Sequence, residues 1–331
     1  MRLKVPGSTA ATYSAAVAAV LALAAVGFVV ATGGLPGKGP VADGDGSGHY
    51  TEPADRADES ARALRGTLTT PPPSPRAHTL PGGAPPAVSG PDGARTEVTA
   101  VDPLPASVPL QARETSPSPA VGPLFYTGQG EPGHSCTASV VHSPRGDLLI
   151  TAAHCVYQDG FRTDIAFAPG YHDGQAPYGV WVPTAIDVDP SWTADRDEDH
   201  DVAFLRVRRA DEDPQGTTRT PVEHVTGAQR LAFHPQAHRP ARVLGYPSDS
   251  ERPVDCQNTT DTSGPAQLRF DCRDMPNGTS GSPVLTDVDP ATGLGTVNGV
   301  IGGRDEGGDD ETSYSSYFGD DIEALYRRAV S

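Results

Sequence analysis

Residues 275–284 read MPNGTSGSPV, which places Ser280 in a glycine-rich turn directly before an apolar run. A serine hydroxyl becomes a useful nucleophile only when a neighbouring base takes its proton and preorganised donors bind the oxyanion that forms. Gly278 can adopt backbone angles that turn its N–H inward beside that of Ser280, and Gly281 leaves room for an acyl group. The stretch therefore predicts Ser280 as a nucleophile, with the N–H groups of Gly278 and Ser280 as an oxyanion hole.

Two other stretches offer the base and the carboxylate that such a serine needs. Residues 149–155 read LITAAHC and place His154 at the end of a strand-like apolar run. Residues 199–207 read DHDVAFLRV, where Asp201 opens another apolar run. An imidazole near its unperturbed pKa can accept and return a proton at neutral pH. We therefore predict a catalytic triad of His154, Asp201 and Ser280.

At these three places the sequence resembles the trypsin-like, chymotrypsin-fold serine peptidases, in which a TAAHC histidine, an aspartate opening a strand and a GxSGxP serine follow in that order. The sequence SGSPV after Thr279 is most similar to the secreted bacterial branch related to glutamyl endopeptidases. The resemblance covers residues 120–331 and implies an all-β fold of two antiparallel six-stranded β-barrels with a C-terminal helix. Short Val-, Ile- and Phe-rich runs separated by Gly, Pro and Asp favour the same architecture. Residues 320–330 have an acidic first turn and a basic last turn, and we expect this helix to pack on the second barrel.

The implied activity is hydrolysis of peptide bonds through an acyl-enzyme, without metal or organic cofactor. Two alternatives stay open, a catalytically silent binding protein on the same fold and an esterase-like hydrolase. The acidic residues just before Asp201, from Asp195 to Asp199, are the other candidates for the triad carboxylate and could instead bind calcium. A solvated loop is the simpler interpretation of that cluster.

The chain contains four cysteines, Cys136, Cys155, Cys256 and Cys272, which allow three pairings. The resemblance implies that Cys136 bonds to Cys155 beside the histidine and that Cys256 bonds to Cys272 before the nucleophile. Disulfides indicate an oxidising compartment, so we expect a secreted or surface protein.

The 331 residues carry a formal net charge of −17, which argues against binding to nucleic acid phosphates. We expect protein or peptide substrates and a monomer. Residues 1–34 combine Arg2 and Lys4 with a long uncharged run, which indicates a secretory signal peptide or an N-terminal membrane anchor. Residues 35–119 are dominated by Pro, Gly, Ala, Ser and Thr, and predict a disordered pro-segment or stalk, with a short helix near residues 53–68 as an open alternative.

Substrate preference depends on Asp274, six residues before Ser280, where trypsins carry the carboxylate that selects Arg or Lys. A basic residue at the substrate's P1 position is the resulting hypothesis, although Asp274 could also be structural. Glutamyl specificity is not expected, because Ile301 and Gly302 stand where that branch uses a histidine. Thr279 lacks the charge with which digestive relatives bind a freed amino terminus.

Overall fold

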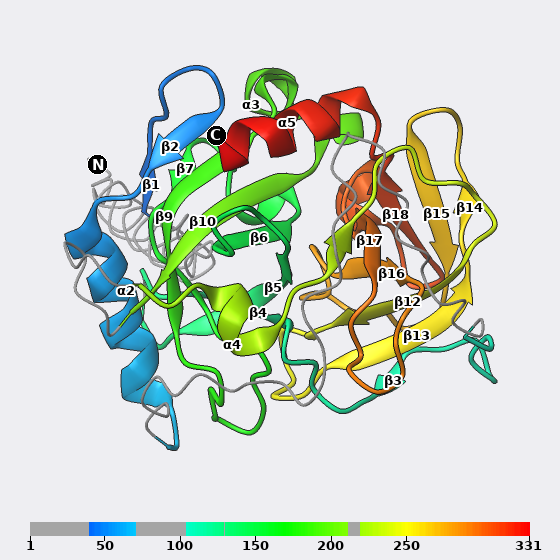
Figure 1. Ribbon diagram of the computed structural model, residues 1–331, viewed down its shortest axis with the longest axis horizontal. Coiled ribbons are helices and arrows are strands. Elements are labelled where there is room, and N and C mark those ends of the chain that lie inside the picture. Colours follow the sequence, from blue (N-terminus) through cyan, green and yellow to red (C-terminus); the bar gives the residue numbers. More distant parts are fainter. Residues whose placement is uncertain (1–39, 71–103, 129, 211–218) are drawn as a thin grey trace, which may run out of the picture. The chain divides into compact units, whose positions relative to one another are not determined.

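The computed structural model describes residues 40–70, 104–128, 130–210 and 219–331 (Figure 1). The predicted signal or anchor segment, residues 1–34, lies outside these ranges. Within them, no helix is long and apolar enough to cross a membrane.

The first half of the domain is a closed antiparallel barrel. Its strands run in the order β10-β6-β5-β4-β8-β9, and β9 pairs with β10 to close the ring. Their bounds are β4 (Val121–Tyr126), β5 (Gly133–Val141), β6 (Leu148–Thr151), β8 (Ile165–Phe167), β9 (Trp181–Val188) and β10 (Ala203–Arg209). All four residues of β6 are buried, so its sequence, LLIT, shows no alternation of apolar and polar residues. The predicted six-stranded first barrel is confirmed.

The second half consists of two sheets. One is six-stranded, in the order β11 (Arg230–Leu231), β17 (Thr296–Val300), β16 (Pro283–Thr286), β12 (Pro240–Gly245), β13 (Val254–Thr259) and β3 (Arg113–Glu114). The other has three strands, β14 (Asp261–Thr262), β15 (Gln267–Asp271) and β18 (Thr312–Ser316). The all-β fold class expected from the sequence is confirmed, and the predicted second six-stranded barrel takes the form of these two sheets. Individual hydrogen bonds link the two sheets. For example, the Asn258 side-chain amide on β13 donates to the Asp271 carbonyl on β15 at 2.8 Å.

Both predicted disulfides are present. Cys136 on β5 bonds to Cys155, and Cys256 on β13 bonds to Cys272, which follows β15. The second disulfide therefore links the two sheets of the second half.

The helices lie outside the sheets: α2 (Ala54–Thr67), α3 (Pro190–Asp195), α4 (Val222–Thr226), α5 (Asp320–Val330) and the 3₁₀ turns η1 (Ala153–Cys155), η2 (Glu198–His200) and η3 (Arg304–Gly307). The predicted C-terminal helix is α5. It buries Ile322, Leu325 and Ala329 in a core cluster to which both halves contribute, including Phe204 of the first barrel and Val300 of the second half. We expected α5 to pack on the second half. It packs on both halves.

The amino-terminal region departs from the prediction of disorder. Two short strands, β1 (Val41–Ala42) and β2 (His49–Thr51), pair with β7 (Phe161–Arg162) and β9 of the first half, and α2 packs beside them (Figure 1). Residues 104–114 run along the second half and end in β3, which pairs with β13. Helix α2 matches the short helix near residues 53–68 that the sequence left open, whereas the Pro- and Gly-rich composition of residues 35–119 gave no sign of β1, β2 or β3. Residues 71–103 lie outside the described ranges.

Candidate active site

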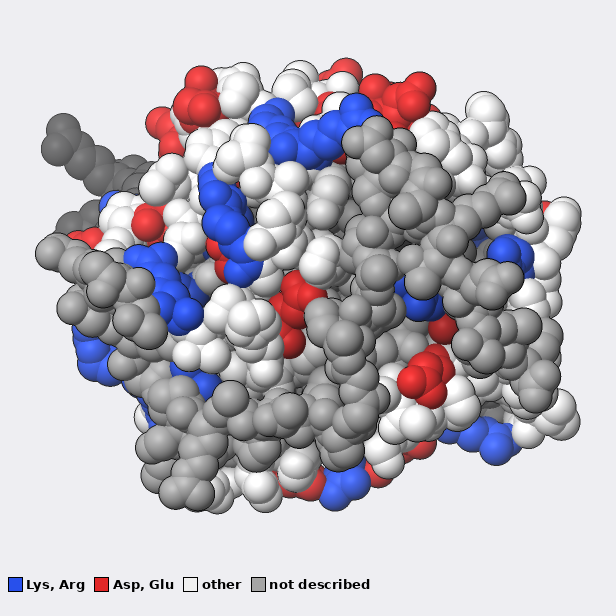
Figure 2. Space-filling view, in the orientation of Figure 1, with Lys and Arg blue, Asp and Glu red and all other residues white. Residues whose placement is uncertain are grey.

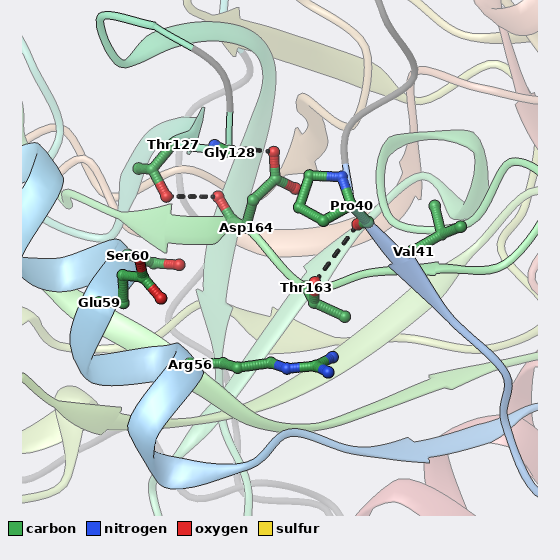
Figure 3. A pocket seen from close by; sticks show the side chains of 9 residues that line it. All are labelled: Pro40, Val41, Arg56, Glu59, Ser60, Thr127, Gly128, Thr163 and Asp164. Carbon is green, nitrogen blue, oxygen red and sulfur yellow. Dashed lines mark hydrogen bonds between the residues drawn. The ribbon is translucent and has the colours of Figure 1, made fainter.

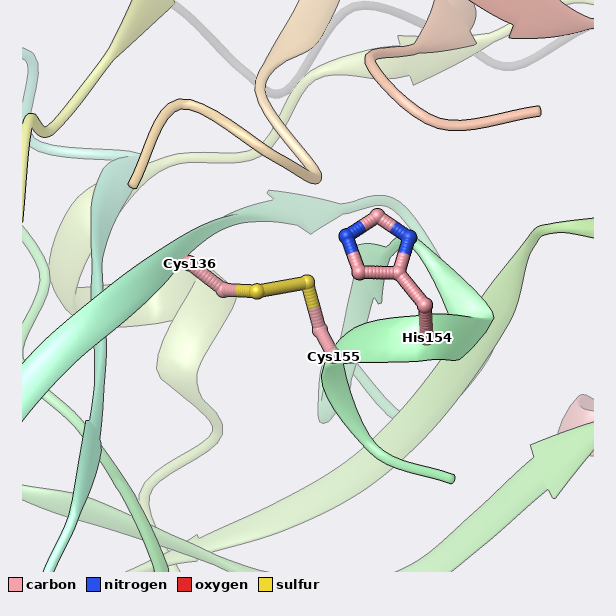
Figure 4. Close-up of side chains that lie close together, drawn as sticks. All are labelled: Cys136, His154 and Cys155. Atoms are coloured by element: carbon pink, nitrogen blue, oxygen red, sulfur yellow. A yellow bond between two sulfur atoms is a disulfide. The ribbon is translucent and has the colours of Figure 1, made fainter. Parts of the chain in front are cut away.

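The backbone at His154 is held by the strand before it and by a disulfide after it. It lies in η1 immediately after the buried strand β6, and Cys155 ties that turn to β5 through the disulfide shown beside the imidazole in Figure 4. Cys136, His154 and Cys155 lie close enough together to form a metal site. The two sulfurs are bonded to each other, however, so these cysteines offer no thiolate to a metal. A second cluster of possible ligands, His234, Asp320 and Glu323, lies apart on the surface.

His154 and Asp201 form a close pair. The Nδ1 atom of His154 lies 2.7 Å from Oδ2 of Asp201, and the backbone N–H of His154 donates to Oδ1 at 2.8 Å. The Asp201 carboxylate is fully buried and also accepts the N–H of Gly303 at 2.9 Å. Because these bonds occupy Nδ1, the other ring nitrogen of His154 is the one free to take a proton.

The environment of His154 acts on its pKa in two directions. Burial alone would lower it, since burial penalises the charged imidazolium. The charge and hydrogen bond of Asp201, with a smaller contribution from Glu306, outweigh burial and raise the pKa above its usual 6.5. A raised pKa favours proton uptake from a nearby hydroxyl.

Ser280 lies in the turn before β16, and its backbone is fixed against the first barrel. The N–H of Thr137 on β5 donates to the Ser280 carbonyl at 2.7 Å. A Cβ atom on Gly281 would lie 2.1 Å from Oγ1 of Thr151 and 3.1 Å from the backbone nitrogen of Ala152, so only glycine allows this approach. The serine is thereby placed beside the residues that immediately precede His154 in the chain.

The segment that follows β17 connects the nucleophile turn to the carboxylate. Gly281 donates its N–H to the Ile301 carbonyl at 2.6 Å, and Gly303, two residues later, donates to Asp201. No hydrogen bond joins the Ser280 hydroxyl to His154 among the described contacts. Such bonds are often long in enzymes without substrate and tighten when substrate binds.

Gly278 has a left-handed backbone conformation. Its φ of 102° lies in the region that favours glycine, and a Cβ atom there would come within 2.3 Å of the Ser248 nitrogen. In the described part of the chain, no group accepts the N–H of Gly278 or that of Ser280. Both donors are therefore available to an oxyanion.

Thr137 is the residue that the sequence analysis missed. It is fully buried, its hydroxyl donates to the Gly278 carbonyl at 3.0 Å, and the same hydroxyl accepts the Tyr246 N–H at 2.8 Å. With its N–H on the Ser280 carbonyl, Thr137 holds the nucleophile turn at two points. Its place directly after Cys136 was the only signal in the sequence.

Asp274 lies apart from this arrangement. Its side chain is exposed, it accepts a hydrogen bond from the Gln111 amide, and its backbone has a left-handed φ of 58°. The backbone N–H of Asp274 donates to the Asp310 carbonyl at 2.9 Å, so the carboxylate lies near the acidic stretch 309–311. The structure does not show Asp274 enclosed at the base of a pocket.

Comparisons with known proteins bear on the family and the fold. Residues 136–293 match the trypsin-like peptidase domain family. Among solved structures, the protease Anisep from Arthrobacter nicotinovorans is 24% identical with a TM-score of 0.57, covering 66% of this chain and 99% of its own. A thermostable serine protease, AL20, from an extremophilic microorganism is 25% identical with a TM-score of 0.55, covering 64% of this chain and 97% of its own.

A third similar structure, a Glu endopeptidase, is 15% identical with a TM-score of 0.52 and covers 66% of this chain and 96% of its own. At identities below 25%, this structure and Anisep bear on the fold alone. No curated protein matches the sequence significantly.

Proposed function

The chain carries a trypsin-like serine peptidase domain, and from this premise we propose that it cleaves proteins or peptides through Ser280, His154 and Asp201. One observation carries the assignment of these residues. The segment from Ile301 to Gly303 bonds to the nucleophile turn at one end and to the Asp201 carboxylate at the other. Together with the Asp201–His154 pair, this arrangement supports a single reaction centre.

In the proposed mechanism, the Ser280 hydroxyl oxygen attacks the substrate carbonyl carbon while the free nitrogen of His154 takes the hydroxyl proton. Asp201 orients the imidazole and stabilises the imidazolium. The N–H groups of Gly278 and Ser280 bind the negative oxygen of the tetrahedral intermediate. His154 then returns the proton to the leaving amine, and water repeats the sequence to release the acid from Ser280.

Labelling with a fluorophosphonate probe tests this proposal against the alternative of a silent binding protein. We expect Ser280 to be labelled and Ser280→Ala to lose both the label and about 10⁶-fold of turnover. Ser282→Ala is the matched control, because the Ser282 hydroxyl is buried two residues away and should not react. Absence of label on Ser280 in folded protein would favour the binding protein, and turnover of esters without peptides would favour the esterase.

We further propose that the protein works in an oxidising, extracytoplasmic compartment, on the support of its two disulfides. Mass spectrometry of protein from the native host, with and without thiol alkylation, tests this. Free alkylated thiols at Cys136 or Cys256 would contradict it.

Preference for a basic P1 residue remains part of the proposal. Acidic side chains Asp305, Glu306 and Asp309–Glu311 lie along the chain on either side of Gly307, in a stretch that continues from the active-site segment 301–303. Their charge would favour cationic substrates. On the face seen in Figure 2, by contrast, acidic and basic side chains are interspersed, so the attraction would be local.

A further inference from the structure

Although β10 closes the ring, β8 leaves part of the other side of β9 unpaired, and the amino-terminal segment, residues 40–70, covers it. Strand β9 pairs with β8 only at Trp181, and β2 pairs with β9 from Ala185 to Asp187. Two backbone bonds extend this pairing, from Glu52 to the Thr184 carbonyl at 3.0 Å and from Val188 to the Gly48 carbonyl at 2.8 Å. Without the segment, this edge of the sheet would present unpaired backbone groups.

Helix α2 covers an apolar face next to that edge. Ala57, Ala61 and Leu64 are buried and lie in one core cluster with residues of β4, β8 and β9. Leu64 has no exposed surface. The segment therefore contributes to the core of the first barrel, and its removal would expose apolar surface to water.

The barrel also carries buried charges whose partners lie on the segment. The Arg208 side chain is 2% exposed and donates to the Ala54 carbonyl at 3.2 Å and to the Asp58 carboxylate. Asp187 is 1% exposed and pairs with His49 of the segment at 2.9 Å, and also with Arg328 of α5 at 3.2 Å. Losing the segment would leave a buried guanidinium without these acceptors, which is unfavourable.

The carboxyl terminus reaches the same segment. Arg328 of α5 donates to the Ser47 carbonyl at 2.7 Å and to the Val188 carbonyl at 2.6 Å, so it bridges the turn before β2 and strand β9. Along α2 the contact is less tight. A hollow with a volume of about 360 Å³ lies beside the helix. Figure 3 shows the side chains that line it, among them Arg56 and Ser60 of α2 and Asp164 of the first half.

From these contacts we propose that residues 40–70 are a permanent, noncovalently held component of the peptidase and not a removable pro-segment. When the connection through residues 71–103 is cut, the amino-terminal fragment stays bound to β9 and the face next to it. The peptidase keeps its activity only while the fragment is bound, because the same barrel carries His154. The surface that binds the fragment and the fragment itself, residues 40–70, thus both belong to this chain.

The test is a full-length chain with a recognition sequence for a site-specific protease inserted between Gly82 and Gly83. After cleavage, size-exclusion chromatography and native mass spectrometry report whether the fragments remain together. We expect co-elution without denaturant and activity within about twofold of the uncut chain. Separate elution of the fragment from a folded remainder would overturn the proposal.

Two glutamine substitutions on α2 sharpen the test. Leu64→Gln places an amide on the buried face and should weaken retention of the fragment at least about tenfold. Arg62→Gln places the same side chain on the exposed face and should leave retention unchanged. Equal retention in the two cut variants would contradict the proposed interface. Because retention is measured without a substrate, this result is independent of the proposed catalytic residues.

Discussion

The hydroxyl of Thr137 donates to the Gly278 carbonyl at 3.0 Å, across 141 residues of sequence. This bond fixes the peptide group that follows Gly278, and the N–H of Thr137 fixes the carbonyl of Ser280. The two predicted oxyanion donors are thus supported from the first barrel, although they belong to the second half. Thr137 is therefore a positioning residue.

Thr137→Val should lower kcat by about 10- to 100-fold with little change in KM, because the hydroxyl supports donors that act mainly in the transition state. Thr137→Ser keeps the hydroxyl and should retain most of the activity. Thr226→Val is the control, since Thr226 is also fully buried and its hydroxyl donates to the Val222 carbonyl at 3.0 Å within α4, not to the nucleophile turn. The affinity for a peptide boronate, which mimics the tetrahedral intermediate, should fall in parallel with kcat. Equal losses for the valine variants at positions 137 and 226 would instead indicate a general effect of a lost buried hydrogen bond.

The pH dependence of activity should report His154. Activity requires the neutral imidazole, and the pKa of His154 lies above 6.5, so kcat/KM should fall as the pH decreases through a value above 6.5. Glu306→Gln removes one of the charges that raise this pKa and should move the midpoint to lower pH. Because Glu306 is exposed, the shift should shrink at high salt. Glu311→Gln serves as the control, and a shift of equal size there would exclude a specific contribution from Glu306.

Asp274 should have only a small effect on substrate choice. An exposed carboxylate contributes little to binding a cation, so Asp274→Asn should reduce kcat/KM for Arg or Lys substrates by less than about fivefold. Peptides that differ only at P1, with Arg, Lys, Ala or Glu, measure both the preference and its change. A loss of 100-fold or more confined to the basic substrates would show that Asp274 lies at the base of the pocket when substrate is bound. No preference for Arg or Lys in the native enzyme would remove the basic-P1 hypothesis altogether.

The sequence predicted those features that local chemistry determines. Gly278, the aspartate two residues before β10 and the TAAHC turn each carry their signal within a few residues. The fold class follows from them by resemblance. Thr137 carries no such signal, because its importance comes from partners more than a hundred residues away. The cysteine pairing was fixed by resemblance and not by spacing.

The amino-terminal segment was misjudged for a different reason. Composition averaged over residues 35–119 is typical of disorder, yet the structured parts form pairs with strands that only the folded barrel supplies. Arg208 of β10 and its carboxylate partner, Asp58 of α2, are 150 residues apart in the sequence. Interactions of this kind cannot be predicted from the composition of the segment itself.

Glu52 should make stability depend on pH through the same segment. Burial is the main cause that raises its pKa to about 7, against 4.5 for an ordinary glutamate. In the unfolded chain Glu52 is charged above 4.5, whereas in the folded protein it stays protonated up to about 7. Stability should therefore decrease between pH 4.5 and 7, by at most roughly 3 kcal/mol, and the loss should be complete above 7. Glu52→Gln cannot ionise, so its advantage over the native protein in urea unfolding should grow across that window and then stay constant. Glu59→Gln on the exposed face of α2 should show no such trend, and a constant difference between native and Glu52→Gln protein from pH 4 to 8 would contradict the buried, protonated carboxyl.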